Sequence, residues 1–463
     1  MRDTKYRVEN LVLYDYKRVE QHLSAMAAKG WRLESIGARL WKYRRAEPAN
    51  VHYAVAYIQD ASQFNPGPTE RQQTLEELCA AAGWTKVTDW FQMQIYCSEA
   101  EEPVPLETEE SVRLEAVHRS MKRNFLPANI LFLLFSLVML GLFIRTLIVD
   151  PLHILENNGG LFLGPLWLLL AAVLLVSLAH YWLWYRRSAR SVAQGGACAA
   201  PGDIRWVDWA GWALLIPWTA LYLLAYLVQG LPGPAVYFVL HMLIICLMIL
   251  LLRRTTALLR RMKASFGLNL VLTLLADVVL AAVLVGGLNF AAIKGGWFNG
   301  DRGETYIYQG QEWDVSPMDL PLTVSDLTGE TYSHISRQDT SAGSVLLPRR
   351  VCREHVMEGT VRRGVRYEIT KPRGWLYDMA VRNAASSREE TFSYQTARFS
   401  WLYTWEEVPA APWGAERAYR ELCDGEFTDT VLLIFSDRLV EFEYSSDLTP
   451  EQMALVGERV KNA

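Results

Sequence analysis

Residues 125–144 read FLPANILFLLFSLVMLGLFI, a run of twenty residues with no charged side chain. A helix that crosses the hydrocarbon core of a bilayer needs about 20 mostly apolar residues, because lipid offers the backbone no hydrogen-bonding partner. Four further runs meet this requirement, at residues 161–185, 207–228, 235–252 and 266–290. The sequence therefore predicts a multi-pass membrane protein with a bundle of five spanning helices over residues 125–293.

The segments that connect these runs differ in charge. Three are rich in arginine and lysine: the segment before the first run, the one between the second and third, and the one between the fourth and fifth. The other two hold only Arg145 or, at residues 229–234, no basic residue. Because basic connectors stay in the cytoplasm, the pattern predicts a cytoplasmic N-terminus and an extracytoplasmic C-terminus in a bacterial cell membrane.

Tryptophan is concentrated beside the basic connectors of the second and third runs. The residues concerned are Trp182, Trp184, Trp206, Trp209 and Trp212. Indole rings favour the headgroup layer, so we interpret these residues as an interfacial belt.

Charge divides the sequence into a basic and an acidic part. From Gly295 onward there are 27 acidic and 18 basic residues, a net charge of −9, whereas the whole chain carries −4. No segment combines a dense basic run with interleaved aromatic residues, so nucleic acid is not an expected partner. We predict a cytoplasmic domain at residues 1–105, a basic linker at 106–124, the membrane bundle, and an extracytoplasmic domain at 294–463.

The N-terminal residues alternate between strand-like and helix-like patterns. Six elements are predicted, in the order β-α-β-β-α-β, over residues 6–13, 15–29, 31–44, 51–58, 69–82 and 84–97. Asp15 is the expected N-cap of the first helix. This order is that of a split βαβ, ferredoxin-like domain.

An internal repeat supports this interpretation. The sequence AAKGW ending at Trp31 recurs as AAAGW ending at Trp84. In each copy, Gly30 or Gly83 can take the left-handed conformation that ends a helix, and the tryptophan can then open a strand. We expect both tryptophans to pack between helix and sheet, with a peptide groove on the open sheet face as the alternative.

Residues 4–100 resemble a bacterial family described as domain of unknown function 2812. The resemblance is carried by MAAKGWRL at residues 26–33, by Tyr53 and Tyr57 in the third strand, and by AAGW at residues 81–84. The following spans also resemble the layout of that family. The resemblance implies no catalytic residue, but it does imply an association with PadR-type regulators.

The C-terminal residues predict a mixed α+β domain with a mostly antiparallel sheet. Strands are expected at residues 304–308, 361–370 and 391–405, with a hairpin over 430–444 and helices at 412–422 and 449–460. Cys352 and Cys423 are the only two cysteines in this domain. In an oxidising exterior they either form a disulfide or remain buried free thiols.

No motif for catalysis, cofactor binding or metal binding occurs in the sequence. It lacks a phosphate-binding loop, a GxGxxG after a strand, HExxH, GxSxG and CxxC. His355 has Glu354 and Glu358 nearby, but three polar residues on one segment fit a solvated surface better than a metal site. We therefore expect no enzymatic activity.

Asp277 stands near the middle of the fifth run, where an ionisable group is costly. Asn269, Asn289 and His241 also lie within membrane runs. Such groups can mark an ion pathway, or Asp277 can be protonated or hydrogen-bonded and fix the packing of the bundle.

These observations favour a non-enzymatic membrane sensor or regulatory scaffold that links an extracytoplasmic domain to a cytoplasmic one. The expected partners are membrane lipid and a protein, such as a PadR-type regulator system. The alternative is a transporter or a transporter accessory subunit, with Asp277 as its intramembrane acid. Five spans do not divide into two equal repeats, which weighs against transport.

Overall fold

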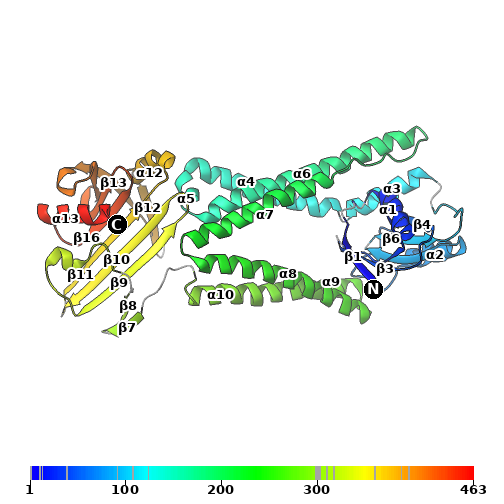
Figure 1. Ribbon diagram of the computed structural model, residues 1–463, viewed down its shortest axis with the longest axis horizontal. Coiled ribbons are helices and arrows are strands. Elements are labelled where there is room, and N and C mark those ends of the chain that lie inside the picture. Colours follow the sequence, from blue (N-terminus) through cyan, green and yellow to red (C-terminus); the bar gives the residue numbers. More distant parts are fainter. Residues whose placement is uncertain are drawn as a thin grey trace. The chain divides into compact units, whose positions relative to one another are not determined.

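The computed structural model describes residues 3–9, 12, 14–37, 40–90, 92–106, 109–123, 125–297, 304–308, 311–315, 319–358, 361–386, 388–394 and 397–463 (Figure 1). The chain divides into two compact units, each of which takes in part of the long helices. The first unit comprises Met1–Gly141, Pro165–Pro217 and Met242–Gly286, and the second comprises Leu142–Gly164, Trp218–His241 and Gly287–Ala463.

The N-terminal domain contains two three-stranded antiparallel sheets and two helices. Its elements are β1 (Thr4–Val8), α1 (Tyr16–Ala28), β2 (Trp31–Ser35), β3 (Leu40–Arg45), β4 (His52–Tyr57), α2 (Glu70–Ala81), β5 (Thr85–Trp90) and β6 (Met93–Ser98). The strand orders are β1-β3-β2 and β4-β6-β5. The same β-α-β-β unit is therefore present twice.

The predicted order β-α-β-β-α-β is wrong at two points, because residues 31–44 and 84–97 each form two strands. A continuous strand of 14 residues would span about 46 Å, much longer than the strands it pairs with. The chain turns back at Gly37, where a Cβ would lie 2.9 Å from the carbonyl oxygen of Leu40. The predicted first strand, residues 6–13, ends at Val8, and residues 10, 11 and 13 lie outside the described residues.

The sequence repeat corresponds to a structural one. Gly30 (φ 78°) and Gly83 (φ 80°) both take the left-handed conformation, as predicted. Each copy also has a β-bulge at the equivalent position, between Leu33 and Ser35 in one and between Lys86 and Thr88 in the other. Two units with the same strand order, the same helix ending and the same bulge point to an internal duplication.

Helix α1 begins and packs as its sequence predicts. The Asp15 side chain accepts a hydrogen bond from the backbone N–H of Arg18, as an N-cap residue does. Its apolar face is buried, with Val19, Leu23 and Met26 in the core of the domain.

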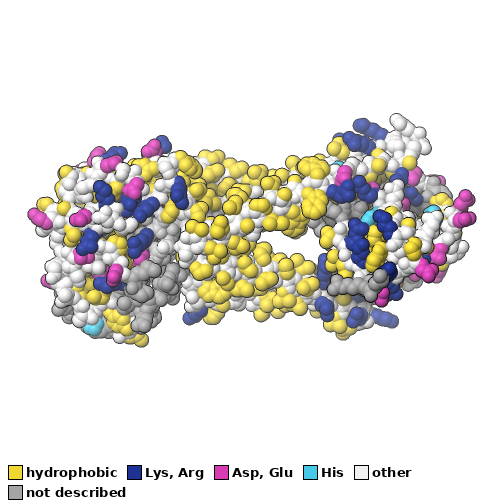
Figure 2. Space-filling view, viewed as in Figure 1, with side chains coloured by type: hydrophobic (Ala, Val, Ile, Leu, Met, Phe, Trp, Pro, Cys, Tyr) yellow, Lys and Arg dark blue, Asp and Glu magenta, His cyan; other side chains and the backbone are white. Residues whose placement is uncertain are grey.

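Among the described residues, five helices are long and apolar enough to cross a membrane, which confirms that prediction. They are α4 (Phe125–Val149), α6 (Asn158–Ala193), α7 (Arg205–Val228), α8 (Pro232–Arg261) and the continuous helix Phe266–Lys294. The last consists of α9 (Phe266–Leu280), a π-helical stretch η1 (Ala281–Val285) and α10 (Gly286–Lys294). Figure 2 shows hydrophobic side chains gathered over these helices, as lipid contact requires. Helix α3 (Glu110–Arg123) precedes them, and the short α5 (Pro151–Leu155) follows α4.

The C-terminal domain is built on one large sheet. The strands are β7 (Glu304–Tyr308), β8 (Gln311–Val315), β9 (His334–Gly343), β10 (Pro348–Glu358), β11 (Val361–Thr370), β12 (Arg388–Tyr394), β13 (Ala397–Val408), β14 (Arg417–Cys423), β15 (Glu426–Ile434) and β16 (Leu439–Tyr444). Their order is β12-β13-β14-β15-β16-β11-β10-β9-β8-β7. Every pairing is antiparallel except that of β8 with β9, so the predicted antiparallel sheet is confirmed.

Helices cover both faces of this sheet (Figure 1). Helices α11 (Val324–Thr328) and α13 (Pro450–Lys461) pack on one face, over a core that includes Tyr367 and Phe442. Helix α12 (Tyr377–Ala384), preceded by a short 3₁₀ turn η2 (Gly374–Leu376), covers part of the other face. The predicted Thr449 cap of α13 is confirmed, because its side chain accepts from the N–H of Gln452.

Two predictions in this domain are wrong. The helix expected at residues 412–422 is a 3₁₀ turn, η3 (Ala411–Trp413), followed by strand β14. Gly414 (φ 60°) ends the turn, and β14 then pairs with β13 and β15, so cross-strand pairing overrides the local preference. The strand expected at residues 391–405 is the hairpin β12–β13, whose residues 395 and 396 lie outside the described residues.

The two repeat glycines provide a matched test of the fold. Both have positive φ, but an added Cβ at Gly30 would lie 2.8 Å from the carbonyl oxygen of Ala46, whereas Gly83 has open space. Gly83→Ala should therefore cost only the backbone strain of about 1 kcal/mol, and Gly30→Ala should cost clearly more. Thermal unfolding of the detergent-purified chain measures both. Equal losses would show that the contact with Ala46 does not constrain the turn.

Candidate functional site

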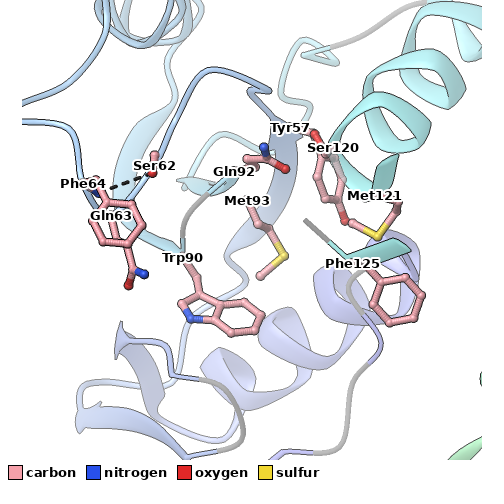
Figure 3. Close-up of a pocket in the computed structure, with 10 residues that line it drawn as sticks. All are labelled: Tyr57, Ser62, Gln63, Phe64, Trp90, Gln92, Met93, Ser120, Met121 and Phe125. Carbon is pink, nitrogen blue, oxygen red and sulfur yellow. Dashed lines mark hydrogen bonds between the residues drawn. The ribbon is translucent and has the colours of Figure 1, made fainter. Parts of the chain in front are cut away.

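The first unit contains a cavity where the second small sheet meets the start of the membrane helices. Strands β4 and β5 both run antiparallel to β6, so the last residues of β4 and β5 lie beside the first residue of β6 at one end of the sheet. These residues are Tyr57, Trp90 and Met93. Helices α3 and α4 form the opposite side of the cavity. The cavity encloses about 280 Å³. Figure 3 shows its lining, which is formed by Tyr57, Ser62, Gln63, Phe64, Trp90, Gln92, Met93, Ser120, Met121 and Phe125.

The cavity lining combines polar and apolar side chains. Gln92 is buried, and its side chain donates to the carbonyl oxygen of Gln59 at 2.9 Å. Ser62 accepts from the backbone N–H of Phe64 at 3.3 Å, the bond drawn in Figure 3. The hydroxyl of Ser120 is fully buried and has no hydrogen-bond partner among the described residues. Since an unpaired buried hydroxyl is unfavourable, Ser120 is the group of this lining that could accept a hydrogen-bonding partner.

The cavity wall is attached to the beginning of a membrane helix. Phe64 packs edge-on against Phe266, with ring centroids 6.1 Å apart, and its carbonyl oxygen accepts from the side chain of Asn269 at 3.2 Å. Asn269, which the sequence suggested as part of an intramembrane pathway, therefore holds a loop of the N-terminal domain. Asp60 in the same loop pairs with Arg71 at 3.2 Å and with Arg123 at 3.5 Å.

A second group of side chains joins the N-terminal domain to α6. We call it the tyrosine–histidine cluster and define it as Tyr14, His118, His180, Tyr181 and Trp184. Tyr14 Oη and His180 Nδ1 share a hydrogen bond of 2.6 Å, and His118 Nδ1 and Tyr181 Oη share one of 2.7 Å. The rings of Tyr14 and Trp184 lie 5.0 Å apart.

This cluster lies within a continuous hydrophobic core. That core contains residues of the N-terminal domain together with α3, α4 and α6. Trp184 is buried there and donates to the carbonyl oxygen of Ala199 at 2.9 Å, so it is not part of an exposed belt. Trp206, Trp209 and Trp212 are exposed, as an interfacial position requires.

Burial keeps the cluster uncharged. Loss of solvation, followed by the charge of Asp15, raises the pKa of Tyr14 above its ordinary value. Loss of solvation, reinforced by Lys122, lowers the pKa of His118 below its ordinary 6.5. His118 also stacks on Tyr185, with centroids 4.0 Å apart. A neutral imidazole is therefore the form that this packing favours.

Hydrogen bonds of Cys198 hold the segment between α6 and α7 to helices α1 and α3. The backbone N–H of Cys198 donates to the Glu110 carboxylate at 2.8 Å, and its carbonyl oxygen accepts from Lys17 at 3.3 Å. Burial raises the pKa of the Cys198 thiol to about 11, so the thiol is protonated and unreactive at neutral pH. Sequence reasoning missed this fastening, because no local pattern joins residues 88 positions apart.

In the second unit, the β9–β10 turn (residues 344–347) is held by the ends of two helices. Asn158 accepts from the backbone N–H of Val345 at 3.2 Å and donates to Gln229 at 2.5 Å. Gln229 in turn donates to the carbonyl oxygen of Gly343 at 3.3 Å, and Ser344 donates to that of Leu155. We call these contacts the turn anchor.

The tryptophans of the two predicted Gly-Trp pairs, Trp31 and Trp84, both contact other residues of the N-terminal domain. Trp84 is buried, contributes to a small core with Cys79 and Tyr96, and donates to the carbonyl oxygen of Val104 at 2.8 Å. Trp31 is only partly buried, and the Lys5 ammonium lies 5.2 Å from its ring. Neither tryptophan lines the cavity.

The structure leaves Asp277 half-buried on α9, one turn before the π-helical stretch η1. Of the other polar residues in the membrane runs, Tyr237 donates to Asn289. His241 packs against Tyr237, with ring centroids 4.9 Å apart. The buried Nδ1 of His241 has no hydrogen-bond partner among the described residues.

Cys352 and Cys423 are both free thiols. Cys352 lies on β10 and Cys423 on β14, and the three strands β11, β16 and β15 lie between them. At about 4.8 Å per strand this separation is near 19 Å, whereas the Cα atoms of a disulfide lie within about 7 Å. In this structure the two thiols therefore lie apart, with Cys352 buried and Cys423 partly buried.

His355 and Glu354 lie on opposite faces of β10, as neighbouring residues of a strand do. Glu354 is buried and pairs with Arg337 at 2.7 Å, so it cannot share a ligand with His355. The side chain of Glu358 lies outside the described residues. In the part of the chain that the structure describes, no three His, Cys, Asp or Glu side chains are grouped as metal ligands.

The lowered pKa of His118 has a consequence for stability. A group whose pKa is lower in the folded state adds stability that is complete above its unfolded pKa, about 6.5, and that is lost as the pH falls. The apparent melting temperature of the purified protein should therefore fall between pH 7.5 and 5.5, and His118→Gln should reduce this fall. His153→Gln, at an exposed histidine, is the control. An unchanged pH dependence in His118→Gln would contradict the assignment.

Comparison with known proteins identifies one region of the chain. A protein-family model described as "Protein of unknown function (DUF2812)" matches residues 15–128. No curated protein and no solved structure matches the chain. The matched residues run from the cap of α1 through α3 into α4, and they include the whole lining of the cavity. The match over residues 15–128 confirms the resemblance to the DUF2812 family that the sequence of residues 4–100 predicts.

Proposed function

We propose that this protein is a non-enzymatic membrane sensor or regulatory scaffold, in which the state of an extracytoplasmic C-terminal domain is passed to a cytoplasmic N-terminal domain. The observation that supports it best is the continuous core that the N-terminal domain forms with α3, α4 and α6. Because residues of the membrane helices form part of this core, a rearrangement of those helices must also change the packing of the N-terminal domain.

The turn anchor supplies the matching connection in the second unit. Asn158 and Gln229 are residues at helix ends, and they bond directly to the backbone of the β9–β10 turn. Leu152 and Leu155 of α5 also pack in a core with Leu347 and Leu376 of the C-terminal domain. A ligand that shifts this domain would therefore shift the helix ends, provided that it binds two arrangements with different affinity.

The long helices contain residues at which they can bend. The boundary between the two units falls after Gly141 in α4, before Pro165 in α6, after Pro217 in α7, after His241 in α8 and after Gly286, next to η1. Four of these five crossings lie beside a glycine, a proline or the π-helical stretch. Proline removes a helical hydrogen bond, and π-helical stretches locally disturb the hydrogen-bond ladder. We infer that changes of bundle arrangement are concentrated at these residues.

The proposal includes a membrane orientation. The basic residues at the ends of α3, α6 and α8 favour a cytoplasmic N-terminal domain in a bacterial cell membrane. The unreactive Cys198 and the uncharged tyrosine–histidine cluster would then lie on the cytoplasmic side. A protein partner, such as a PadR-type regulator, would contact the N-terminal domain.

Epitope tags at the two ends test the orientation. In intact cells, external protease should remove a C-terminal tag, whereas an N-terminal tag should be cleaved only after permeabilisation. Cleavage of both tags from the same side of intact cells would refute the proposed link across the membrane.

The rate at which a maleimide labels Cys198 tests the coupling between the C-terminal and N-terminal domains. In a chain whose other five cysteines are replaced by serine or alanine, maleimide labels Cys198 only when its bonds to Glu110 and Lys17 open. Asn158→Ala, which breaks the turn anchor, should change this labelling rate severalfold. The double variant Pro165→Ala, Pro217→Ala, with stiffer helices, should reduce the effect. A labelling rate indifferent to Asn158→Ala would contradict the sensor proposal.

The alternative function, transport, is favoured by the position of Asp277 beside η1, because π-helical stretches are frequent at functional sites. Asp277→Asn distinguishes the alternatives. Lost flux of a candidate substrate in proteoliposomes, with unchanged melting temperature, would support transport. A lower melting temperature would show that Asp277 supports helix packing.

A further inference from the structure

One face of the C-terminal sheet is only partly covered. On β10 and β11, Cys352, Val356, Val365 and Tyr367 point to the face that α11 and α13 cover. Because strand residues alternate, Arg353, His355, Arg366 and their neighbours point to the other face. At one end of that face α12 and α5 pack over Leu432, Ile434 and Leu439. The other end is an open groove.

The groove has a volume of about 530 Å³ and is predominantly basic. Its lining residues are Arg353, His355, Arg362, Arg363, Gly364, Val365, Arg366, Asp429, Glu443 and Ser445. Arg366 pairs weakly with Glu443 at 3.5 Å. Among the described residues, no carboxylate lies within ion-pair distance of Arg353 or Arg362. This excess of positive charge stands out in a segment whose net charge is −9.

The register of the strands sets the spacing of these charges. Arg353 lies directly opposite Arg366, which in turn lies opposite Glu443. Arg362 lies four residues before Arg366 on β11, a distance of about 13 Å along the strand. Arg353 and Arg366 thus stand side by side at one end of a row, and Arg362 stands at the other end, so the row is longer than a single small anion.

Glycine and histidine shape the middle of this row. His355 lies opposite Gly364, and a Cβ on Gly364 would lie 2.5 Å from His355 Nδ1. The absence of a side chain thus lets the imidazole lie over the β11 backbone, between Arg362 and Arg366. Burial, reinforced by Arg362 and Arg353, lowers the pKa of His355, so the ring adds a hydrogen-bonding group without further charge.

We propose that this groove binds a linear polyanion with repeating phosphate groups. Arg353 and Arg366 contact one stretch of that chain, and Arg362 contacts a phosphate several units farther along it. Guanidinium groups match phosphate oxygens through paired hydrogen bonds, which favours phosphate as the repeating anion. The length of the row favours a chain over a single ion. This binding names a ligand class that the sensor proposal leaves open, but it requires neither the proposed orientation nor the proposed coupling.

The test uses the full chain in detergent and an end-labelled linear polyphosphate as the probe, followed by fluorescence anisotropy. Arg353→Gln and Arg362→Gln should each weaken binding by about threefold to fivefold, and the double variant by about tenfold or more. Arg382→Gln removes an exposed arginine of α12 in the same domain and should leave binding unchanged. Glu443→Gln should strengthen binding, since it releases Arg366 from its carboxylate.

Competition identifies the ligand class. Unlabelled polyphosphate should displace the probe at far lower phosphate concentration than orthophosphate does, and at lower charge concentration than polyglutamate does. Equal competition by orthophosphate would overturn the inference of a chain, and equal competition by polyglutamate would overturn that of phosphate. Unchanged binding in the double arginine variant, weaker binding in Glu443→Gln, or an equal loss in Arg382→Gln would overturn the site itself.

Discussion

The backbone of a chain in hydrocarbon must satisfy its own hydrogen bonds, and the rest of this structure depends on that constraint. It makes the middle of the chain helical and directs apolar side chains outward. It also explains why polar side chains on these helices bond to their own backbone. Ser136, Ser177 and Thr256 each donate to the carbonyl oxygen four residues earlier, at 2.7, 2.8 and 2.9 Å. His241, whose buried Nδ1 lacks a partner among the described residues, departs from this pattern.

Features that are encoded locally could be predicted from the sequence. The five membrane helices, the caps at Asp15 and Thr449 and the left-handed glycines at positions 30 and 83 each depend on residues within a few positions of one another. The division of residues 31–44 and of residues 84–97 into two strands each could not be predicted, because strand-forming residues stand on both sides of each division. Strand β14 could not be predicted either, because its pairing with β13 and β15 outweighs its local helical pattern.

The candidate site was much less predictable. Asp277 and Asn269 were candidates because polar groups are costly in a membrane. The side chain of Asn269 donates a hydrogen bond to the carbonyl oxygen of Phe64, which lies 205 residues earlier in the sequence. The cavity and the fastening of Cys198 both join segments far apart in sequence. His180 and His118 are unremarkable as single residues, and only folding pairs them with Tyr14 and Tyr181. A single sequence contains no record of such pairings.

The packing of α5 within the C-terminal domain has a consequence for how the protein is made. Leu152 is synthesised with the first hairpin of membrane helices, whereas Leu347, Leu432 and Leu439 emerge some 200 to 290 residues later. That core cannot close until the last strands have been synthesised and brought to the same side of the bilayer as α5. The apolar residues of α5 therefore stay without these packing partners while the remaining helices are inserted. Premature termination before Leu347 would leave α5 without any of these packing partners, and termination before β16 would still remove Leu439.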